Sequence, residues 1–189
     1  MLSNEILDNA GTIDKYMGDC IMAFWNAPTD QENHTDLALK ASFDMEKALE
    51  KFNIEFQKQK GMELKIGIGI NTGECIVGNM GSEKRFDYTV LGDPVNLASR
   101  LEGQSGTYGF QRILGQETVN ALKSNANLFE LDLIQVKGKS EPVKIYTSFD
   151  EFSLKDGKLT EFIKDHKEFL QNYRDQKWDI ALNLSLIHI

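Results

Sequence analysis

Asn96 and Arg100 lie four residues apart in a segment that carries the signals of a helix start. An aspartate N-cap followed by proline, at positions 93 and 94, predicts a helix to about Glu102. The two polar side chains then share one face. A guanidinium can stabilise a phosphoryl transition state, and the amide beside it can hold a sugar oxygen. From the spacing alone, a surface arginine paired with an acid is the simpler interpretation.

Asp19 is a second candidate for charge chemistry. It follows Gly18 and precedes the apolar run Cys20–Trp25, which predicts a hairpin whose second strand is buried on both faces. Such a turn would hold the carboxylate rigidly and leave it accessible, as a magnesium ligand needs. The alternative is an aspartate that only forms the turn. Lys15, on the preceding strand, could bind a ligand or could be a solvated edge lysine.

Other common site types are excluded by spacing. The glycines at 67, 69, 73, 78 and 81 match neither the phosphate-loop nor the dinucleotide-binding pattern, because Gly67 and Gly69 lie inside a predicted strand. His34, His166 and His188 are scattered along the chain, so no zinc constellation or histidine-based triad follows.

The elements that must position these residues alternate between strands and helices. Leu64–Ile70 alternates apolar residues with lysine and glycine, which predicts a strand whose glycine face allows close approach to the backbone. Apolar spacing predicts a long helix from Asp30 to Gly61 that covers a sheet. We further expect a hairpin at 11–25, strands at 75–77, 88–91 and 113–114, a loop opened by Gly78 and Gly81, a helix at 117–122, and a closing hairpin of 128–136 and 142–149 around Lys137–Lys139. This order indicates α+β or α/β architecture.

Composition narrows the class of protein. The 189 residues, with 41% hydrophobic and 26% charged, are enough for one domain with a core. The formal charge of −8 argues against binding to nucleic acid. Two cysteines without a C-x-x-C pair favour a reducing compartment. With no signal peptide, membrane span or other membrane contact in the sequence, we predict a cytoplasmic location.

The C-terminal part, residues 151–189, differs from the domain expected over residues 1–150. Charged residues interspersed with Phe162, Phe169, Tyr173 and Trp178 predict an amphipathic helical extension whose end is truncated. Its Tyr-x4-Trp-x2-Ala pattern is faintly similar to the opening helix of a tetratricopeptide repeat. A plain packing helix or a linker is the better interpretation of one partial copy.

Four separated segments combine these polar residues with their predicted elements. They are Gly11–Trp25, with Lys15 and Asp19; Gly67–Gly73; Phe86–Glu102, with Thr89, Asn96 and Arg100; and Val136–Lys139, with Lys137. In this order they resemble the class III adenylyl and guanylyl cyclase catalytic domain, over about residues 10 to 150.

The resemblance implies a ferredoxin-like, palm-type α+β fold that works as a homodimer with active sites at the interface. It implies an adenylate cyclase, a phosphorus–oxygen lyase of cyclic nucleotide signalling that converts ATP to 3′,5′-cyclic AMP and pyrophosphate with two Mg²⁺ or Mn²⁺ ions per site. By resemblance, Asp19 is a metal ligand and Asn96 orients the ribose. Arg100 stabilises the pentavalent phosphorus, and Lys137 holds the terminal phosphates. By resemblance, the C-terminal helix is typical of bacterial cyclases that carry membrane-tethered sensor modules upstream.

The resemblance places Lys15 and Thr89 at the two base-reading positions. Adenine presents an acceptor at N1 and a donor at N6, whereas guanine presents the reverse pattern. A lysine ammonium can donate to N1 and a threonine oxygen can accept from N6, so ATP is the predicted substrate. Many relatives carry aspartate at the position of Thr89, and guanylyl cyclases typically carry glutamate at that of Lys15.

One departure from the family pattern concerns the first metal-binding aspartate. In the family it lies on a central strand well upstream of the second, but only eighteen residues precede Asp19 here. The first strand and first helix of the fold are therefore expected to be absent, which would leave two strand edges unpaired and the isolated chain unstable or inactive. Asp8 and Asp14 precede Asp19 outside the family context, and neither is assigned as a ligand. A degenerate nucleotide-binding or dimerisation module, or a guanylate cyclase, is the alternative.

Overall fold

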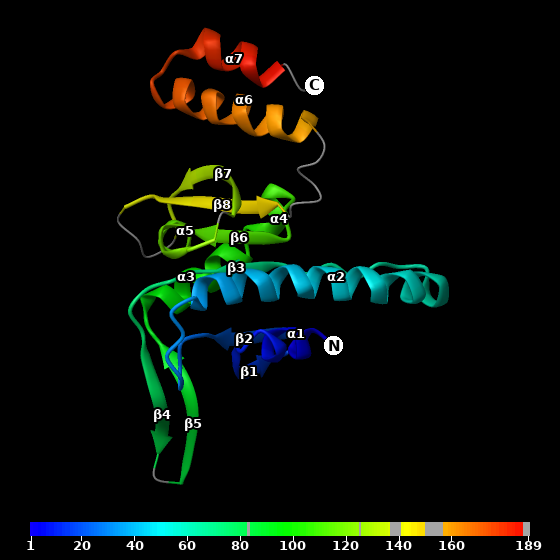
Figure 1. Cartoon of the computed structure of the whole chain (residues 1–189), viewed down its shortest axis with the longest axis vertical. Helices are drawn as coiled ribbons and strands as arrows, with labels where there is room; N and C mark the ends of the chain where they lie inside the picture. Colours follow the sequence, from blue (N-terminus) through cyan, green and yellow to red (C-terminus); the bar gives the residue numbers. More distant parts are fainter. Residues whose placement is uncertain (83, 125, 137–140, 150–156, 187–189) are drawn as a thin grey trace.

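The computed structural model describes residues 1–82, 84–124, 126–136, 141–149 and 157–186, which form the predicted α+β arrangement (Figure 1). Among these residues, none of the helices combines the length and apolar character needed to cross a membrane. The elements are α1 Leu2–Asp8, β1 Thr12–Met17, β2 Cys20–Phe24, α2 His34–Lys60, β3 Ile68–Ile70, β4 Ile76–Ser82, β5 Arg85–Leu91, α3 Asp93–Glu102, α4 Ser105–Tyr108, β6 Arg112–Gly115, α5 Gln116–Ala121, β7 Asn127–Ile134, β8 Val143–Phe149, α6 Gly157–Arg174 and α7 Trp178–Leu186.

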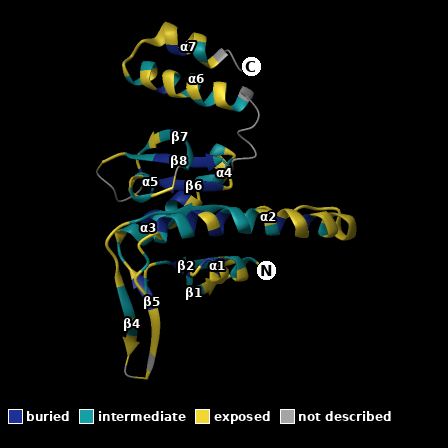
Figure 2. Ribbon diagram, viewed as in Figure 1, coloured by how far each residue is buried: buried dark blue, intermediate teal, exposed yellow. Residues whose placement is uncertain are grey.

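A four-stranded sheet in the order β3-β6-β8-β7 forms the centre of the core. β3 and β6 are parallel, whereas β8 is antiparallel to both of its neighbours. The side chains of Leu101, Ile113 and Ile145 are completely buried in it, and Figure 2 shows the buried residues gathered around these strands. Because α3 packs directly on β3 and β6, its polar face is held by the best-packed part of the molecule.

Gly69 explains how α3 comes so close to the sheet. A β-carbon at this position would collide with the carbonyl oxygen of Ala98 and the amide nitrogen of Glu102, both in α3. The expected close approach to the glycine face of this strand is confirmed, and a helix backbone is what approaches it.

The strand around Gly69 is shorter than the predicted Leu64–Ile70, since β3 covers only Ile68–Ile70. The side chain of Asn53 in α2 accounts for the difference. Its Nδ2 donates to the Leu64 carbonyl at 2.8 Å, and its Oδ1 accepts from the Leu64 amide at 3.0 Å. A buried amide side chain therefore satisfies backbone groups that a neighbouring strand would otherwise pair.

The loop predicted at Gly78 and Gly81 is wrong, because both glycines belong to β4. β4 pairs antiparallel with β5 along its whole length and forms a two-stranded arm that projects from the domain (Figure 1). Among the described residues, no atom lies within 4 Å of the position that a β-carbon at Gly78 would occupy. The missing side chain therefore leaves no packing contact unmade at this position of the strand. Ile76, Phe86 and Leu91 of the arm are exposed, with Ile76 at 71%.

The predicted N-terminal hairpin is confirmed, with β1 and β2 joined by a turn at Gly18-Asp19. Burial of β2 on both faces is wrong, because Cys20 is exposed and only Phe24 is buried. Among the described residues, β1 and β2 form a separate two-stranded sheet, and β3 is an edge strand of the four-stranded sheet.

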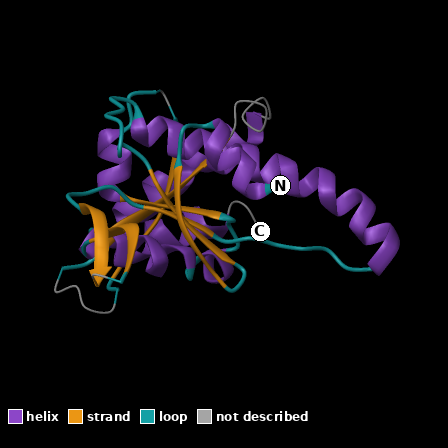
Figure 3. Cartoon of the chain, turned by 90° about the horizontal axis from the view of Figure 1, so that it is seen from below, coloured by secondary structure: helices purple, strands orange, loops and turns teal. Residues whose placement is uncertain are grey.

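The long helix α2 begins at His34, later than the predicted Asp30, and ends at the predicted Gly61. Reciprocal hydrogen bonds between Asn26 and Gln31, each from a backbone amide to the other side chain, hold the preceding residues in a turn. Seen from below, α2 lies alongside the strands and its C-terminal end extends past them (Figure 3).

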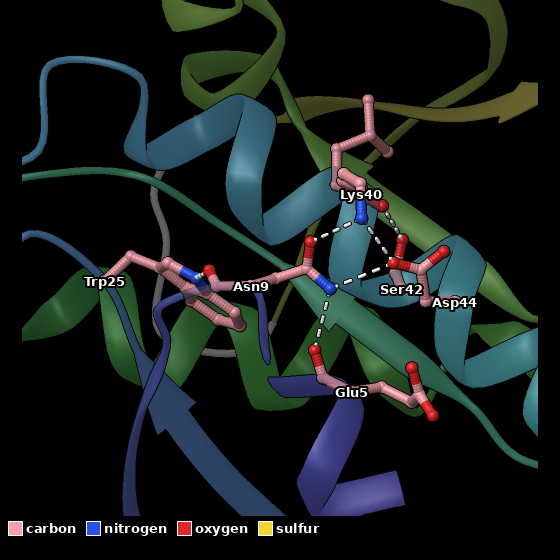
Figure 4. Close-up of polar contacts among 7 residues, drawn as sticks. Glu5, Asn9, Trp25, Lys40, Ser42 and Asp44 are labelled. Atoms are coloured by element: carbon pink, nitrogen blue, oxygen red, sulfur yellow. Dashed lines mark hydrogen bonds and ion pairs between the residues drawn. The ribbon is translucent and has the colours of Figure 1, made fainter. Parts of the chain in front are cut away.

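Asn9 ties the N-terminal elements to α2, as Figure 4 shows. Its buried side-chain amide donates to the Glu5 carbonyl at 2.8 Å and to Asp44 at 2.9 Å, and its Oδ1 accepts from Lys40 at 2.8 Å. Its backbone carbonyl accepts from the Trp25 indole at 2.9 Å. The entry into β1 is therefore fixed relative to α2.

The C-terminal part of the chain forms α6 and α7, which pack against each other, with α6 lying over β7 (Figure 1). Phe129 of β7 stacks on Phe162 and His166 of α6, with ring centroids 5.4 and 4.3 Å apart. The predicted boundary near residue 150 lies outside the described residues.

Candidate active site

Lys15 and Thr89, the predicted base-reading pair, meet where β1 contacts β5. Lys15 Nζ donates to Thr89 Oγ1 at 3.2 Å, although the residues are 74 positions apart in the sequence. Thr89 is only 6% exposed. The structure brings the two side chains together, and their contact with a base stays a prediction.

Asp14 joins this pair, and the sequence analysis did not assign it to the site. Its side chain is completely buried, and its Oδ2 accepts the Thr89 hydroxyl at 2.6 Å and the Val90 amide at 3.1 Å. Its Oδ1 lies 3.2 Å from Lys15 Nζ. We call Asp14, Lys15 and Thr89 the base cluster.

A β-bulge explains why Asp14 was missed. Neighbouring residues of a regular strand point to opposite faces, which would separate Asp14 from Lys15. In β1 the register passes from Ile13 opposite Ala23 to Lys15 opposite Met22, so Asp14 is the extra residue. A bulge turns consecutive side chains toward the same side. The adjacent Asp-Lys pair was the only signal in the sequence.

Asn96 and Arg100 occupy α3 as predicted, with Gly92 rather than Asp93 as the N-cap. The Asn96 amide is exposed and donates to the Gly92 carbonyl at 3.4 Å. Arg100 Nη1 is buried and has no hydrogen-bond partner among the described residues. An unpaired buried N–H is costly, so this donor suits an acceptor from a ligand or a second chain. Within the described part of the chain, no hydrogen bond or ion pair links these residues to the base cluster.

Next to the start of α3 lies an open cavity at the base of the β4–β5 arm. Its volume is about 630 Å³, and it is lined by Glu74, Cys75, Ile76, Leu91 and Gly92. Partial burial raises the pKa of the Cys75 thiol, so this group stays protonated near neutral pH. The cavity is therefore lined by apolar groups and one acid beside the helix N-terminus.

Asp19 lies exposed in the β1–β2 turn. Partial burial raises the pKa of the neighbouring Cys20 thiol, and the charges of Glu102 and Asp19 raise it further. Among the described residues, no three His, Cys, Asp or Glu side chains form a group that could hold a metal ion. One carboxylate does not complete a magnesium site. Lys137 lies outside the described residues.

Comparisons with known proteins identify the family to which this chain belongs. The family described as the adenylate and guanylate cyclase catalytic domain matches residues 8–151. The chain belongs to this family. An adenylate cyclase of Anabaena cylindrica is 40% identical over 153 residues, covering 77% of this chain and 29% of that protein. Adenylate cyclase 1 of Rhizobium meliloti is 35% identical over 147 residues, covering 77% and 22%. The chain thus spans less than a third of these curated relatives.

Solved cyclase structures share the fold. The adenylyl cyclase CyaB from P. aeruginosa is 35% identical with a TM-score of 0.70, covering 79% of this chain and 77% of that one. The guanylyl cyclase Cya2 is 36% identical with a TM-score of 0.68, covering 78% and 74%. An adenylyl cyclase and a guanylyl cyclase are about equally similar to this chain. Overall similarity therefore does not show which nucleotide base the chain prefers, and that question depends on individual residues.

Proposed function

We propose that this domain is an adenylate cyclase that converts ATP to 3′,5′-cyclic AMP and pyrophosphate. The contact between Lys15 and Thr89 carries the proposal, because it sets a donor beside an oxygen acceptor. That pair complements N1 and N6 of adenine. The N1 hydrogen of guanine would meet an ammonium that cannot accept it.

The reaction is an intramolecular phosphoryl transfer. The ribose 3′-oxygen loses its proton and bonds to the α-phosphorus, while the bond from that phosphorus to the pyrophosphate oxygen breaks. Negative charge builds on the phosphoryl oxygens, and the unpaired buried Nη1 of Arg100 is a donor suited to them. We assign the contact with the ribose to the exposed Asn96 amide, one helical turn earlier.

A second copy of the chain completes the site in this proposal. The base cluster and the α3 pair are not bonded to each other among the described residues, and the arm exposes apolar side chains that a partner would cover. A homodimer that combines the base cluster of one chain with Arg100 of the other accounts for both observations.

The test is product formation by the full-length protein with ATP or GTP in the presence of Mg²⁺ or Mn²⁺. We expect cyclic AMP, identified by mass spectrometry, and much less cyclic GMP. Arg100→Ala should lower kcat about a hundredfold, equivalent to about 2.7 kcal/mol of transition-state stabilisation. Arg174→Ala is the matched control, because that arginine, the last residue of α6, pairs with Glu130 of β7. A folded dimer that forms no cyclic nucleotide contradicts the proposal, and predominant cyclic GMP points to a guanylate cyclase.

A degenerate nucleotide-binding or dimerisation module is the second candidate. The incomplete metal-ligand set among the described residues favours it. Calorimetry of the full-length protein that detects ATP binding, combined with no cyclic product, would support this function instead.

A further inference from the structure

We propose that Asp14 determines the preference for adenine by committing the hydroxyl proton of Thr89, an inference that rests on the adenylate cyclase function proposed above. Asp14 is a positioning residue here, since it acts on the base through Thr89 and Lys15.

A threonine hydroxyl alone discriminates poorly between the two purines. It carries one donor hydrogen and two acceptor lone pairs, and the hydrogen rotates to suit its neighbour. A free Thr89 could accept from the amino group at N6 of adenine, or it could turn and donate to O6 of guanine. Some other group must therefore fix the direction of its hydrogen bond.

The Asp14 carboxylate supplies that constraint. As an ionised carboxylate it only accepts, so the 2.6 Å contact with Thr89 Oγ1 uses the hydroxyl proton of Thr89. The same carboxylate oxygen also accepts from the Val90 amide at 3.1 Å, which anchors it to β5. Complete burial keeps water from competing for either bond.

Lys15 then occupies one lone pair of the hydroxyl. Its Nζ donates to Thr89 Oγ1 at 3.2 Å and lies 3.2 Å from Asp14 Oδ1. One lone pair of Thr89 is left beside the ammonium of Lys15, whose hydrogens are not all used by Thr89 and whose side chain is 42% exposed. The base cluster therefore offers one acceptor beside one donor. Adenine matches this pattern, whereas O6 of guanine would face the lone pair of an oxygen that can no longer donate.

The decisive experiment compares kcat/KM for ATP and GTP in the full-length protein and in Asp14→Asn. The neutral amide oxygen of an asparagine accepts the Thr89 hydroxyl more weakly than a carboxylate does, so the Thr89 proton is held less firmly. We expect the ATP:GTP ratio to fall about tenfold, which corresponds to about 1.4 kcal/mol. Asp36→Asn is the matched control, because Asp36 is also an aspartate that accepts two hydrogen bonds, here from the backbone amides of Lys123 and Ser124, away from the base cluster. It should leave the ratio unchanged.

A double-mutant cycle with Thr89→Val shows whether Asp14 acts through the hydroxyl. Thr89→Val should itself lower the ratio, and adding Asp14→Asn should then lower it no further. A loss that persists in the valine background overturns the inference. So does a folded Asp14→Asn variant in which the rates with both nucleotides fall together, because that is the behaviour of a purely structural residue.

The combined variant Asp14→Asn/Thr89→Asp keeps the inference testable if Asp14→Asn alone does not fold. It moves the carboxylate to position 89, retains a partner for Lys15 and should restore ATP preference to at least the level of the unaltered protein. A preference as low as that of Thr89→Val overturns the inference. Competition of ATP and GTP for a site that holds a fluorescent ATP analogue compares the affinities of the two nucleotides without turnover. Absence of cyclic product therefore counts against the proposed function, whereas an unchanged binding ratio in Asp14→Asn counts against the role of Asp14.

Discussion

Two clusters in this molecule each contain a cation and a carboxylate and link elements that are distant in the sequence, and they differ in which polar atoms they leave open to a ligand. Arg112 of β6 is 3% exposed and donates to Ser42 at 2.7 Å, to the Ser148 carbonyl at 3.2 Å and to the Glu46 carboxylate. Its guanidinium also lies 3.6 Å from the centre of the Phe43 ring. In the base cluster, by contrast, the cation Lys15 remains 42% exposed.

The contrast separates structural ion pairs from ligand sites. The guanidinium of Arg112 donates to groups inside the fold and so joins α2 to the central sheet. These donors are therefore not available to a ligand. The base cluster keeps its carboxylate buried and leaves the Lys15 ammonium accessible beside the Thr89 oxygen. Similar charges therefore serve stability in one place and recognition in the other, according to which polar atoms are already satisfied.

Breaking the closed cluster should have the largest effect. Arg112→Ala leaves the Glu46 carboxylate and the buried Ser148 carbonyl without this partner, so we expect a loss of about 3 to 5 kcal/mol in the free energy of unfolding. Urea titration followed by circular dichroism measures it, with the more exposed Arg174→Ala as the control. A loss below about 1 kcal/mol would place Arg112 among weak surface pairs instead.

Opening the base cluster further should cost less stability and more activity. Lys15→Ala removes a half-exposed ammonium whose place water can take, so the free energy of unfolding should fall by about 1 kcal/mol. The kcat/KM for ATP should fall at least about tenfold, because hydrogen bonds from a charged donor contribute about 1.5–3 kcal/mol. Parallel urea titrations and initial rates test both values. If stability falls as far as in Arg112→Ala, the distinction between the clusters does not hold.

His166 provides the smallest test, because it is a half-buried ionisable ring whose hydrogen-bond partner is the Glu130 carbonyl rather than a charged group. Burial lowers its pKa, and the charge of Arg174 lowers it further, against the opposing effects of the Glu130 carbonyl bond and of the charges of Glu130 and Asp132. The folded state thus binds a proton less readily than the unfolded chain, whose histidines titrate near pH 6.5. Stability should be full above this pH and decline as pH falls below it. Melting temperatures at pH 7.5 and 5.5 should differ less in His166→Gln, and an equal difference would contradict this role.

Local signals account for what could be predicted. The hairpin at Gly18-Asp19, the helix carrying Asn96 and Arg100, the end of α2 at Gly61 and the C-terminal helices all follow from turn residues, caps and periodic apolar spacing. Those signals involve residues within a few positions of one another, where propensity and capping act. The family motifs likewise brought Lys15 and Thr89 to attention before any contact between them was visible.

Contacts between distant residues account for the rest. Asn53 shortens β3 from eleven positions away, and the pairing of β4 with β5 makes an arm of a stretch that looked like a loop. The bulge that turns Asp14 toward Thr89, 75 positions later, depends on how β1 registers with β2. The sequence shows which side chains can carry charge or form hydrogen bonds. Packing decides whether each of them stabilises the fold or stays available to a ligand, because burial and pairing depend on the residues that the fold places beside that side chain.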